Sequence, residues 1–315
     1  MVASAVIEFT DQVAIVTGAG RGLGRLYALE LAQRGATVVV NDLGGSMHGE
    51  GADSGVADAV VNEILEAGGR AIASHDSVAT VEGGARIVQT AVKEFGRLDV
   101  VVSNAGIFHT TEFENLTPDE WERMVNVHLH GAFYLSQPAY RVMKSQRHGR
   151  FVFVSSSAGL FGQPNSAHYA AAKAGVVGLS NVIAIEGAPH GISANCVLPF
   201  GYSRMVTETV GDRDQFQGEL PFLDSIEPEL VVPIVVFLAS RECEVTHHSF
   251  SACAGRFSRV FVGQAHGWVA ARGANPSADD IAAHWTEVTA QEPYSVPDSI
   301  FDEVAETCSI VGIPL

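Results

Sequence analysis

Near its beginning the chain reads Val13-Ala-Ile-Val-Thr-Gly-Ala-Gly-Arg-Gly-Leu-Gly24, a short apolar run followed by four glycines within seven residues. The apolar run is typical of a buried strand, and the amphipathic stretch 25–34 after the glycines predicts a helix. A strand, a glycine turn and a helix in this order aim backbone N–H groups and a helix N-terminus at a phosphate. The segment therefore predicts a nucleotide site at the start of an α/β domain.

The spacing of the glycines narrows the kind of nucleotide. Leu23 occupies the third glycine place of the strict Gly-x-Gly-x-x-Gly pattern, so the spacing present is Thr17-Gly18-x-x-x-Gly22-x-Gly24. The lysine of a P-loop is absent, which argues against a nucleoside triphosphatase. For the glycines alone, an ordinary tight turn between strand and helix remains the alternative.

Asp42 ends the next apolar run, residues 36–42. A carboxylate at the end of a second strand accepts hydrogen bonds from an adenosine ribose and repels a 2′-phosphate. Asp42 therefore favours NAD over NADP. The alternative is a plain turn aspartate before Gly44-Gly45.

Tyr169 and Lys173 stand four residues apart within residues 166–175. On a helix this spacing places both side chains on one face. An ammonium beside a phenol favours the phenolate, so we expect Lys173 to lower the pKa of Tyr169 from its ordinary value near ~10. A chance surface pair is the alternative for this motif taken alone.

Apolar runs and helical patterns alternate along the chain, which predicts a parallel sheet with helices on both faces. Strands are expected at 13–17, 36–42, 70–74, 98–103, 150–155, 193–198 and 249–253, and helices at 25–34, 53–66, 81–95, 117–144 and 166–186. The expected fold is α/β, a doubly wound parallel sheet of about seven strands. Its ligand crevice lies at the carboxyl ends of the strands.

Composition and charge exclude several classes of protein. A net charge of −17 over 315 residues would repel a phosphate backbone, so nucleic acid is not an expected partner. No apolar run approaches the ~18–20 residues that span a bilayer, and no secretory signal is evident. Gly312-Ile-Pro-Leu315 is not a peroxisomal address, and the four cysteines form no Cys-x-x-Cys pair. We expect a cytoplasmic protein.

Taken together, the motifs resemble those of the short-chain dehydrogenase/reductase family over residues 9–262. The matching elements are Thr17-Gly18-x-x-x-Gly22-x-Gly24, Asn104-Ala-Gly106, Asn126, Ser156, Tyr169 and Lys173. Some strings are most similar to the (3R)-hydroxyacyl-CoA dehydrogenase domains of peroxisomal multifunctional enzymes of type 2: Val40–Gly45, His75–Ser77, Ala184–Gly187 and Ser203–Met205. The resemblance implies a Rossmann fold and hydride transfer between NAD and a secondary alcohol or ketone, best matched by a 3-hydroxyacyl-CoA.

The resemblance also implies roles for site residues. Tyr169 would be the general acid or base, Ser156 would bind the substrate oxygen, and Lys173 would hold the nicotinamide ribose. Asn126 would position a water in the proton relay. Ser155 and Ser157 remain alternatives to Ser156. The cofactor would contact Gly18, Arg21, Gly22, Leu23, Gly24, Asp42, Asp76, Ser77, Asn104, Ala105, Gly106, Tyr169, Lys173, Pro199 and Gly201.

Two positions are open within this assignment. The family usually shows Pro-Gly after the sixth strand, whereas here Phe200 separates Pro199 from Gly201. Arg21 fits a phosphate partner or a solvated side chain equally well.

Other site chemistries are disfavoured. The histidines lack His-Glu-x-x-His or a similar ligand spacing, so no metal is expected. His128 and His130 are two apart and should face different sides of a helix. A serine hydrolase built on Ser155–Ser157 and His168 would require Gly-x-Ser-x-Gly, which is absent.

Substrate choice is expected to depend on a lid at about residues 201–225, where Arg204, with Arg256 and Arg259, could meet an acyl-CoA phosphate. Ordinary surface arginines are the alternative. A hydroxysteroid or other hydrophobic alcohol is the competing substrate class, since a fold does not fix a substrate. A non-catalytic NAD-binding sensor or scaffold is the alternative from a different functional class.

Residues 263–315 extend beyond the usual family domain, 1–262 here. Helices are expected to begin near Pro276 and Asp298, and Trp268, Ile281 and Trp285 give the extension enough apolar surface to dock. We expect it to pack on the core or across a contact between copies of a homo-oligomer.

Overall fold

A computed structural model describes residues 6–202 and 221–314 of the chain. It divides between Arg259 and Val260 into two compact units, which are described separately. The sequence analysis placed this boundary after residue 262.

The first unit contains an eight-stranded sheet in the order β3-β2-β1-β4-β5-β6-β7-β8. The strands are β1 (Val13–Thr17), β2 (Thr37–Asn41), β3 (Arg70–Ser74), β4 (Val100–Ser103), β5 (Gly149–Val154), β6 (Ile192–Phe200), β7 (Ser249–Cys253) and β8 (Arg256–Val260). All neighbouring pairs from β3 through β7 are parallel. The doubly wound prediction is therefore confirmed.

The strand number was underestimated by one. Ala254 and Gly255 adopt positive φ values of 51° and 75°, and the chain then adds β8 beside β7. The sequence does not indicate β8, because Arg256-Phe-Ser-Arg-Val260 is short and mostly exposed, without the apolar run that marks the inner strands.

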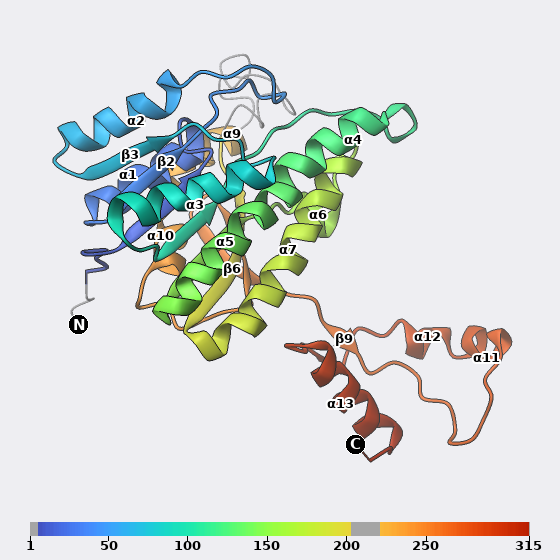
Figure 1. The fold of residues 1–315 in the computed structure, drawn as a ribbon. Coiled ribbons are helices and arrows are strands. Elements are labelled where there is room, and N and C mark those ends of the chain that lie inside the picture. Colours follow the sequence, from blue (N-terminus) through green and yellow to red (C-terminus); the bar gives the residue numbers. More distant parts are fainter. Residues whose placement is uncertain (1–5, 203–220, 315) are drawn as a thin grey trace. The chain divides into compact units, whose positions relative to one another are not determined.

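Helices cover both faces of the sheet (Figure 1). The principal helices are α1 (Gly22–Gln33), α2 (Gly55–Glu66), α3 (Val81–Phe95), α4 (Pro118–Val125), α5 (Gly131–Gln146), α7 (Ala167–Gly187) and α10 (Val232–Ala239); shorter ones are α6 (Ala158–Phe161), α9 (Pro221–Ser225), η1 (Phe113–Asn115), η3 (Ala188–His190) and η5 (Pro228–Val231). Alternate residues of each strand face opposite layers, as a period of two requires. In β1, Ala14 and Val16 pack with α1, α2 and α10, whereas Val13 and Ile15 pack with α3, α5 and α7. Within the described ranges, no helix combines the length and the apolarity needed to cross a membrane.

The single long helix expected from residue 117 to 144 is interrupted. Thr117 and Glu120 form the predicted capping box, but α4 ends at Val125 and a π-helical turn, η2 (Asn126–His130), precedes α5. A π turn inserts one residue into a helix, and such turns occur frequently at functional sites. The apolar pattern does not reveal the insertion, because both flanking helices keep their own period.

The site position follows from the sheet order. β1 has β2 on one side and β4 on the other, so the chain direction of the crossovers reverses between β1 and β4. Ligands of open α/β sheets bind at such a switch point, outside the carboxyl ends of the strands. Here those ends lead into Gly18 and Asn104.

The second unit comprises α11 (Ala278–Ala283), α12 (Trp285–Val288), α13 (Ile300–Val311) and a two-stranded antiparallel sheet of β9 (Gln264–Ala265) with β10 (Tyr294–Ser295). Capping by Ser277 and Ser299 begins α11 and α13, close to the predicted starts. No residue from 260 to 314 is buried, although this unit carries many large apolar side chains.

Candidate active site

The glycine turn leaves β1 in a conformation that only glycine adopts easily. Gly18 and Gly22 have φ values of 62° and 53°. A Cβ on Gly18 would lie 2.7 Å from the Ala105 Cα, and one on Gly24 would lie 2.1 Å from the Gly18 carbonyl oxygen. A Cβ on Gly22 would meet nothing within 4 Å. Two glycines thus permit close backbone packing, while Gly22 faces open space at the start of α1.

Hydrogen bonds tie the carboxyl ends of β1 and β4 together. The Thr17 hydroxyl accepts the backbone N–H groups of Asn104, at 3.0 Å, and Ala105, at 3.1 Å. The Asn104 side-chain amide donates to the carbonyl oxygens of Thr17 and Gly18 at 2.9 and 3.2 Å. Asn104 therefore holds the floor of the groove, while Ala105 and Gly106 line it.

Asp42 leaves β2 and connects two glycine-rich segments. One carboxylate oxygen accepts the N–H of Gly20 at 2.8 Å, and the other accepts the N–H of Gly44 at 2.7 Å. Gly20 was not among the predicted site residues. A Cβ there would come within 2.3 Å of Val56 Cγ1 and 2.9 Å of the Asp42 carboxylate, so the carboxylate is held against a position without a side chain.

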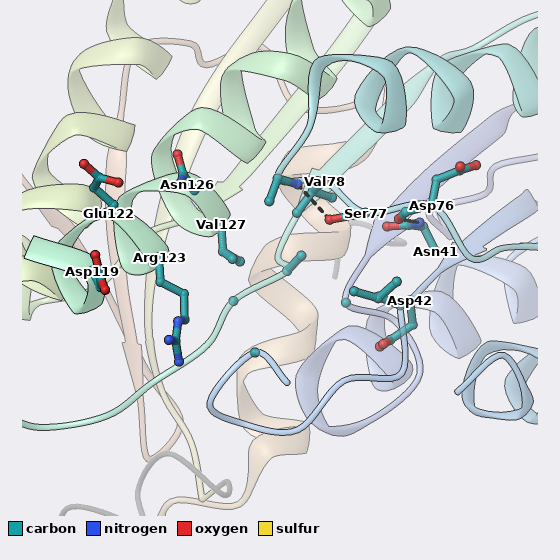
Figure 2. A pocket seen from close by; sticks show the side chains of 16 residues that line it. Asn41, Asp42, Asp76, Ser77, Val78, Asp119, Glu122, Arg123, Asn126 and Val127 are labelled. Atoms are coloured by element: carbon teal, nitrogen blue, oxygen red, sulfur yellow. Dashed lines mark hydrogen bonds between the residues drawn. The ribbon is translucent and has the colours of Figure 1, made fainter. Parts of the chain in front are cut away.

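A cavity of about 530 Å³ lies beside these residues. Figure 2 shows Asn41, Asp42 and Asp76 on one side of it and Arg123 and Val127 on the other. Its lining includes the predicted contacts Gly18, Asp42, Asp76, Ser77, Ala105, Gly106 and Asn126, together with Leu43, Gly49, Val78, Ala79, Asp119 and Glu122, which were not predicted. The charged side chains among the lining residues are four carboxylates and the guanidinium of Arg123.

Asp76 and Ser77 are both held in place at the cavity. The Asp76 carboxylate accepts from Arg86 Nε at 2.6 Å, and its carbonyl oxygen accepts from the Asn41 amide at 2.9 Å. The Ser77 hydroxyl accepts the Ala79 N–H at 3.2 Å, drawn dashed in Figure 2.

The second group of predicted residues gathers at the carboxyl end of β5 and the start of α7. Tyr169 and Lys173 are both buried, and Lys173 Nζ lies 5.7 Å from the centroid of the Tyr169 ring. The four-residue step thus places the two groups side by side, as expected. Lys173 Nζ donates to the Val154 carbonyl oxygen at 2.6 Å.

The structure distinguishes among the three consecutive serines. The Ser155 hydroxyl is buried and donates to the Lys173 carbonyl oxygen at 2.8 Å, so it serves the packing of β5 against α7. Ser156 hydrogen-bonds the Tyr169 side chain, and this bond acts to lower the tyrosine pKa. Ser157 immediately precedes α6 and makes no capping bond. The geometry favours Ser156 as the partner of Tyr169.

The expectation that Lys173 lowers the pKa of Tyr169 is wrong for this structure. Burial raises the pKa of Tyr169 above its ordinary value of 10.0, and only the bond with Ser156 opposes that shift. Burial also lowers the pKa of Lys173 from 10.5 to about 7. Desolvation penalises the charged form of both groups, so the helical spacing alone misjudged the balance.

Two aromatic side chains near Tyr169 were not predicted. Phe108 and His128 each pack edge-to-face against the Tyr169 ring, with centroids 5.1 and 5.2 Å away. His128 lies under Gly106, where a Cβ would come within 2.4 Å of its ring. Burial lowers the pKa of His128 well below 6.5, so the ring is neutral. In the sequence, the only indication of this role for His128 was its position two residues after Asn126. The structure places it on the inner side of the π turn.

The prediction from the two-residue spacing of His128 and His130, near Asn126, is confirmed. His128 is buried and His130 is exposed, so the two face different sides. His130 Nδ1 lies 2.7 Å from Asn126 Oδ1, and this bond ties the asparagine side chain to the outer face of the helix. Asn126 itself lines the cavity at the π turn.

The remaining predicted residues are spread around the site. Leu23 packs into the core and Arg21 is exposed, with Nη1 3.5 Å from the Gly45 carbonyl oxygen. Pro199 lies within β6 opposite Ala252, and Gly201 packs closely on Pro228. Arg204 and most of the expected lid, residues 203–220, lie outside the described residues. Arg256 and Arg259 lie on β8. No group of three or more His, Cys, Asp or Glu in the described ranges is placed to hold a metal.

Comparison with known proteins decides the family. Residues 12–215 match the family described as short chain dehydrogenase. The chain belongs to the short-chain dehydrogenase/reductase family. As a member of this family the protein is an oxidoreductase, and the cavity beside the glycine turn is where a nicotinamide cofactor of the family would bind.

Two curated relatives and one solved structure are similar over most of the chain. A short-chain type dehydrogenase/reductase of Mycobacterium tuberculosis is 43% identical over 283 residues, covering 89% of this chain and 94% of the relative. The peroxisomal hydratase-dehydrogenase-epimerase of Saccharomyces cerevisiae is 41% identical over 308 residues, covering 93% of this chain but 32% of the relative. The full-length peroxisomal multifunctional enzyme type 2 of Drosophila melanogaster aligns with a TM-score of 0.78 and 28% identity, over 97% of this chain and 50% of that one. The chain thus spans half or less of these two multifunctional proteins.

Proposed function

We propose that this chain is an NAD-dependent dehydrogenase whose substrate is a 3-hydroxyacyl-CoA thioester. The observation that carries the proposal is the convergence of Ser156, Tyr169 and Lys173 at the carboxyl end of β5, on the same edge of the parallel sheet as the glycine turn and Asp42. The similarity to peroxisomal multifunctional enzymes over most of this chain supports the substrate class.

The residues at the switch point fit a dinucleotide. Gly22 leaves open space at the start of α1, where no side chain caps the helix, so the backbone N–H groups of the first turn can donate hydrogen bonds to a phosphate. The Asp42 carboxylate and the acidic cavity favour a ribose that carries free hydroxyls. When bound, NAD would supply the hydride-accepting ring, and the protein supplies orientation and proton handling.

The chain's own groups can handle the proton. The Ser156 hydroxyl would orient the substrate oxygen, and the Tyr169 phenol would exchange a proton with that oxygen. Because burial favours the neutral phenol, Tyr169 is prepared to donate its proton in ketone reduction. In alcohol oxidation the same phenol must first lose its proton, so the oxidation rate should rise with pH.

A substrate panel tests the proposal. We expect NAD reduction with 3-hydroxyacyl-CoA thioesters to exceed that with hydroxysteroids by at least about tenfold in kcat/KM. Tyr169→Phe should lose about 10²–10⁴ in rate and still bind NAD. A preference for hydroxysteroids would contradict the proposed substrate, and turnover by Tyr169→Phe at the wild-type rate would contradict the proposed proton transfer.

We further propose that the protein works as a cytoplasmic homo-oligomer. The support for association is the second unit, whose apolar side chains are not buried by the rest of that unit. Cell fractionation would test the location, and light scattering would test the association.

A further inference from the structure

A pair of histidines lies directly beside the catalytic tyrosine. His168, the residue before Tyr169, is fully buried, and its Nε2 lies 3.0 Å from Nε2 of His109. The two rings are nearly perpendicular, with an interplanar angle of 79°. A hydrogen bond between two imidazole nitrogens requires one N–H donor and one lone pair, so at least one ring must be neutral.

Three contacts in the described part of the chain, this bond among them, connect the loop after β4 with residues 165–169. Phe108 packs on Tyr169, His109 bonds His168, and the Thr111 N–H donates to the Asn165 carbonyl oxygen at 2.8 Å. The order of these contacts shows that the two segments run antiparallel. The histidine bond is the polar contact nearest to the tyrosine in this pairing.

In the described part of the chain, the charged and titratable groups around the pair lie on α4, on η2 and on α7 itself. Glu120 of α4 lies 3.7 Å from His109 Nε2, and hydrogen bonds from Thr117 lower the pKa of Glu120 to about 2. His128 of η2 and Lys173 of α7 are the other titratable groups on this side of the tyrosine. Glu120 therefore keeps its negative charge and favours a shared proton on His109.

His168 is the ring that resists protonation. It is the second residue of α7, where the positive end of the helix dipole disfavours a cation. Burial lowers the pKa of His168 below 6.5, and the neighbouring His109 acts in the same direction. Protonation of both rings would turn both facing nitrogens into donors and replace the bond by repulsion.

We propose that His109 and His168 are positioning residues, which hold Tyr169 against the loop after β4 through a one-proton hydrogen bond and release it when both rings are charged. The inference rests on the proposed function only in taking Tyr169 as the group that exchanges the proton. Neither histidine is among the described residues that line the cavity, so the effect of the pair should fall on kcat and on pH dependence.

Variants at His109 test the pair, because its side chain is 15% exposed and tolerates change better than His168. His109→Gln retains a hydrogen-bonding group but cannot be protonated, whereas His109→Leu has no such group. At pH 8 we expect His109→Leu to lower kcat about tenfold with KM for NAD nearly unchanged, and His109→Gln to restore most of the rate. His190→Gln, at the opposite end of α7, is the matched control.

The pH profile separates positioning from a general structural role. As the pH falls from about 8 to below the lowered pKa of His168, the wild-type kcat should fall at least about threefold further than that of His109→Gln, because only the wild-type pair can become doubly charged. The contribution of Lys173 to the pH dependence of kcat is the same in both proteins, so it cancels in the comparison. Superimposable profiles, or an unaltered kcat in His109→Leu, would overturn the proposal.

An NMR titration, which needs no turnover, distinguishes failure of the histidine-pair proposal from failure of the proposed function. In ¹H–¹⁵N spectra of the unliganded full chain, the His168 ring should titrate at a different pH in His109→Gln than in the wild type. An unchanged His168 titration overturns the pairing. Absence of wild-type turnover on every substrate, with the titration shifted as expected, rejects the dehydrogenase proposal instead.

Discussion

At the residue scale, the proposed preference for NAD depends on Asp42. Both of its carboxylate oxygens are already engaged by backbone N–H groups, from Gly20 and Gly44. The charge is therefore fixed at the end of β2, where we propose that it disfavours a nucleotide with a 2′-phosphate.

Substitution of Asp42 should change cofactor preference. We expect Asp42→Ser to raise the ratio of kcat/KM with NADP to that with NAD by at least about tenfold, because the repulsive charge is removed. Steady-state kinetics with both cofactors would measure the ratio. Asp53→Ser, in the same loop, is a control for general loosening, and an unchanged ratio in Asp42→Ser would contradict the assignment.

The buried amine of Lys173 should lower the stability of the folded protein, because burial disfavours its charged form. Its folded-state pKa of about 7 lies below the unfolded-state value of 10.5, so the unfolded chain binds more protons between these values. Stability should therefore rise with pH across that window and be lost as pH falls toward 7.

The substitution Lys173→Met removes the buried amine. We expect the unliganded protein to gain about 1–2 kcal/mol at pH 7 and to lose most of this pH dependence, while activity is abolished. Urea unfolding from about pH 7 to 10 would show it. A variant whose stability changes with pH as steeply as the wild type would refute this explanation.

At the scale of elements, the site depends on the junction between β1 and β4. The Thr17 hydroxyl accepts two backbone N–H groups there and is itself buried. Thr17→Ala leaves these donors without their partner, so we expect a loss of about 1–3 kcal/mol in stability and weaker NAD binding.

The matched control is Thr17→Ser, which keeps the hydroxyl and should retain most of both properties. Thermal unfolding and NAD titration of the two variants would separate the hydroxyl from the methyl group. If serine is no better than alanine, packing rather than hydrogen bonding holds the junction.

At the scale of the whole molecule, the second unit differs from the first because it has almost no hydrophobic core of its own. Ile300 and Phe301 are 68% and 79% exposed, and no residue from 260 to 314 is buried. Apolar surface of this kind marks an interaction site.

Truncation after Gly263 should therefore reduce association between copies of the chain. We expect a smaller assembly in size-exclusion chromatography with light scattering, and lower thermal stability at equal concentration. An assembly and activity equal to those of the full chain would show that residues 264–315 serve neither.

The sequence by itself determined the alternation of strands and helices, the doubly wound sheet and the location of Gly18, Asp42, Tyr169 and Lys173 near its carboxyl edge. Local period, turn chemistry and motif spacing carry these features, and all are readable along the chain. It also identified both helix starts in the second unit from their capping residues.

Tertiary structure alone decided the π turn at Asn126–His130 and the hydrogen bond from Gly20 to Asp42. It also decided the different hydrogen-bond partners of Ser155 and Ser156, and the pairing of His109 with His168. These features depend on contacts between segments distant in sequence. It also reversed the expected pKa of Tyr169, because desolvation depends on how completely the surrounding elements exclude water. No spacing along the chain reports that quantity.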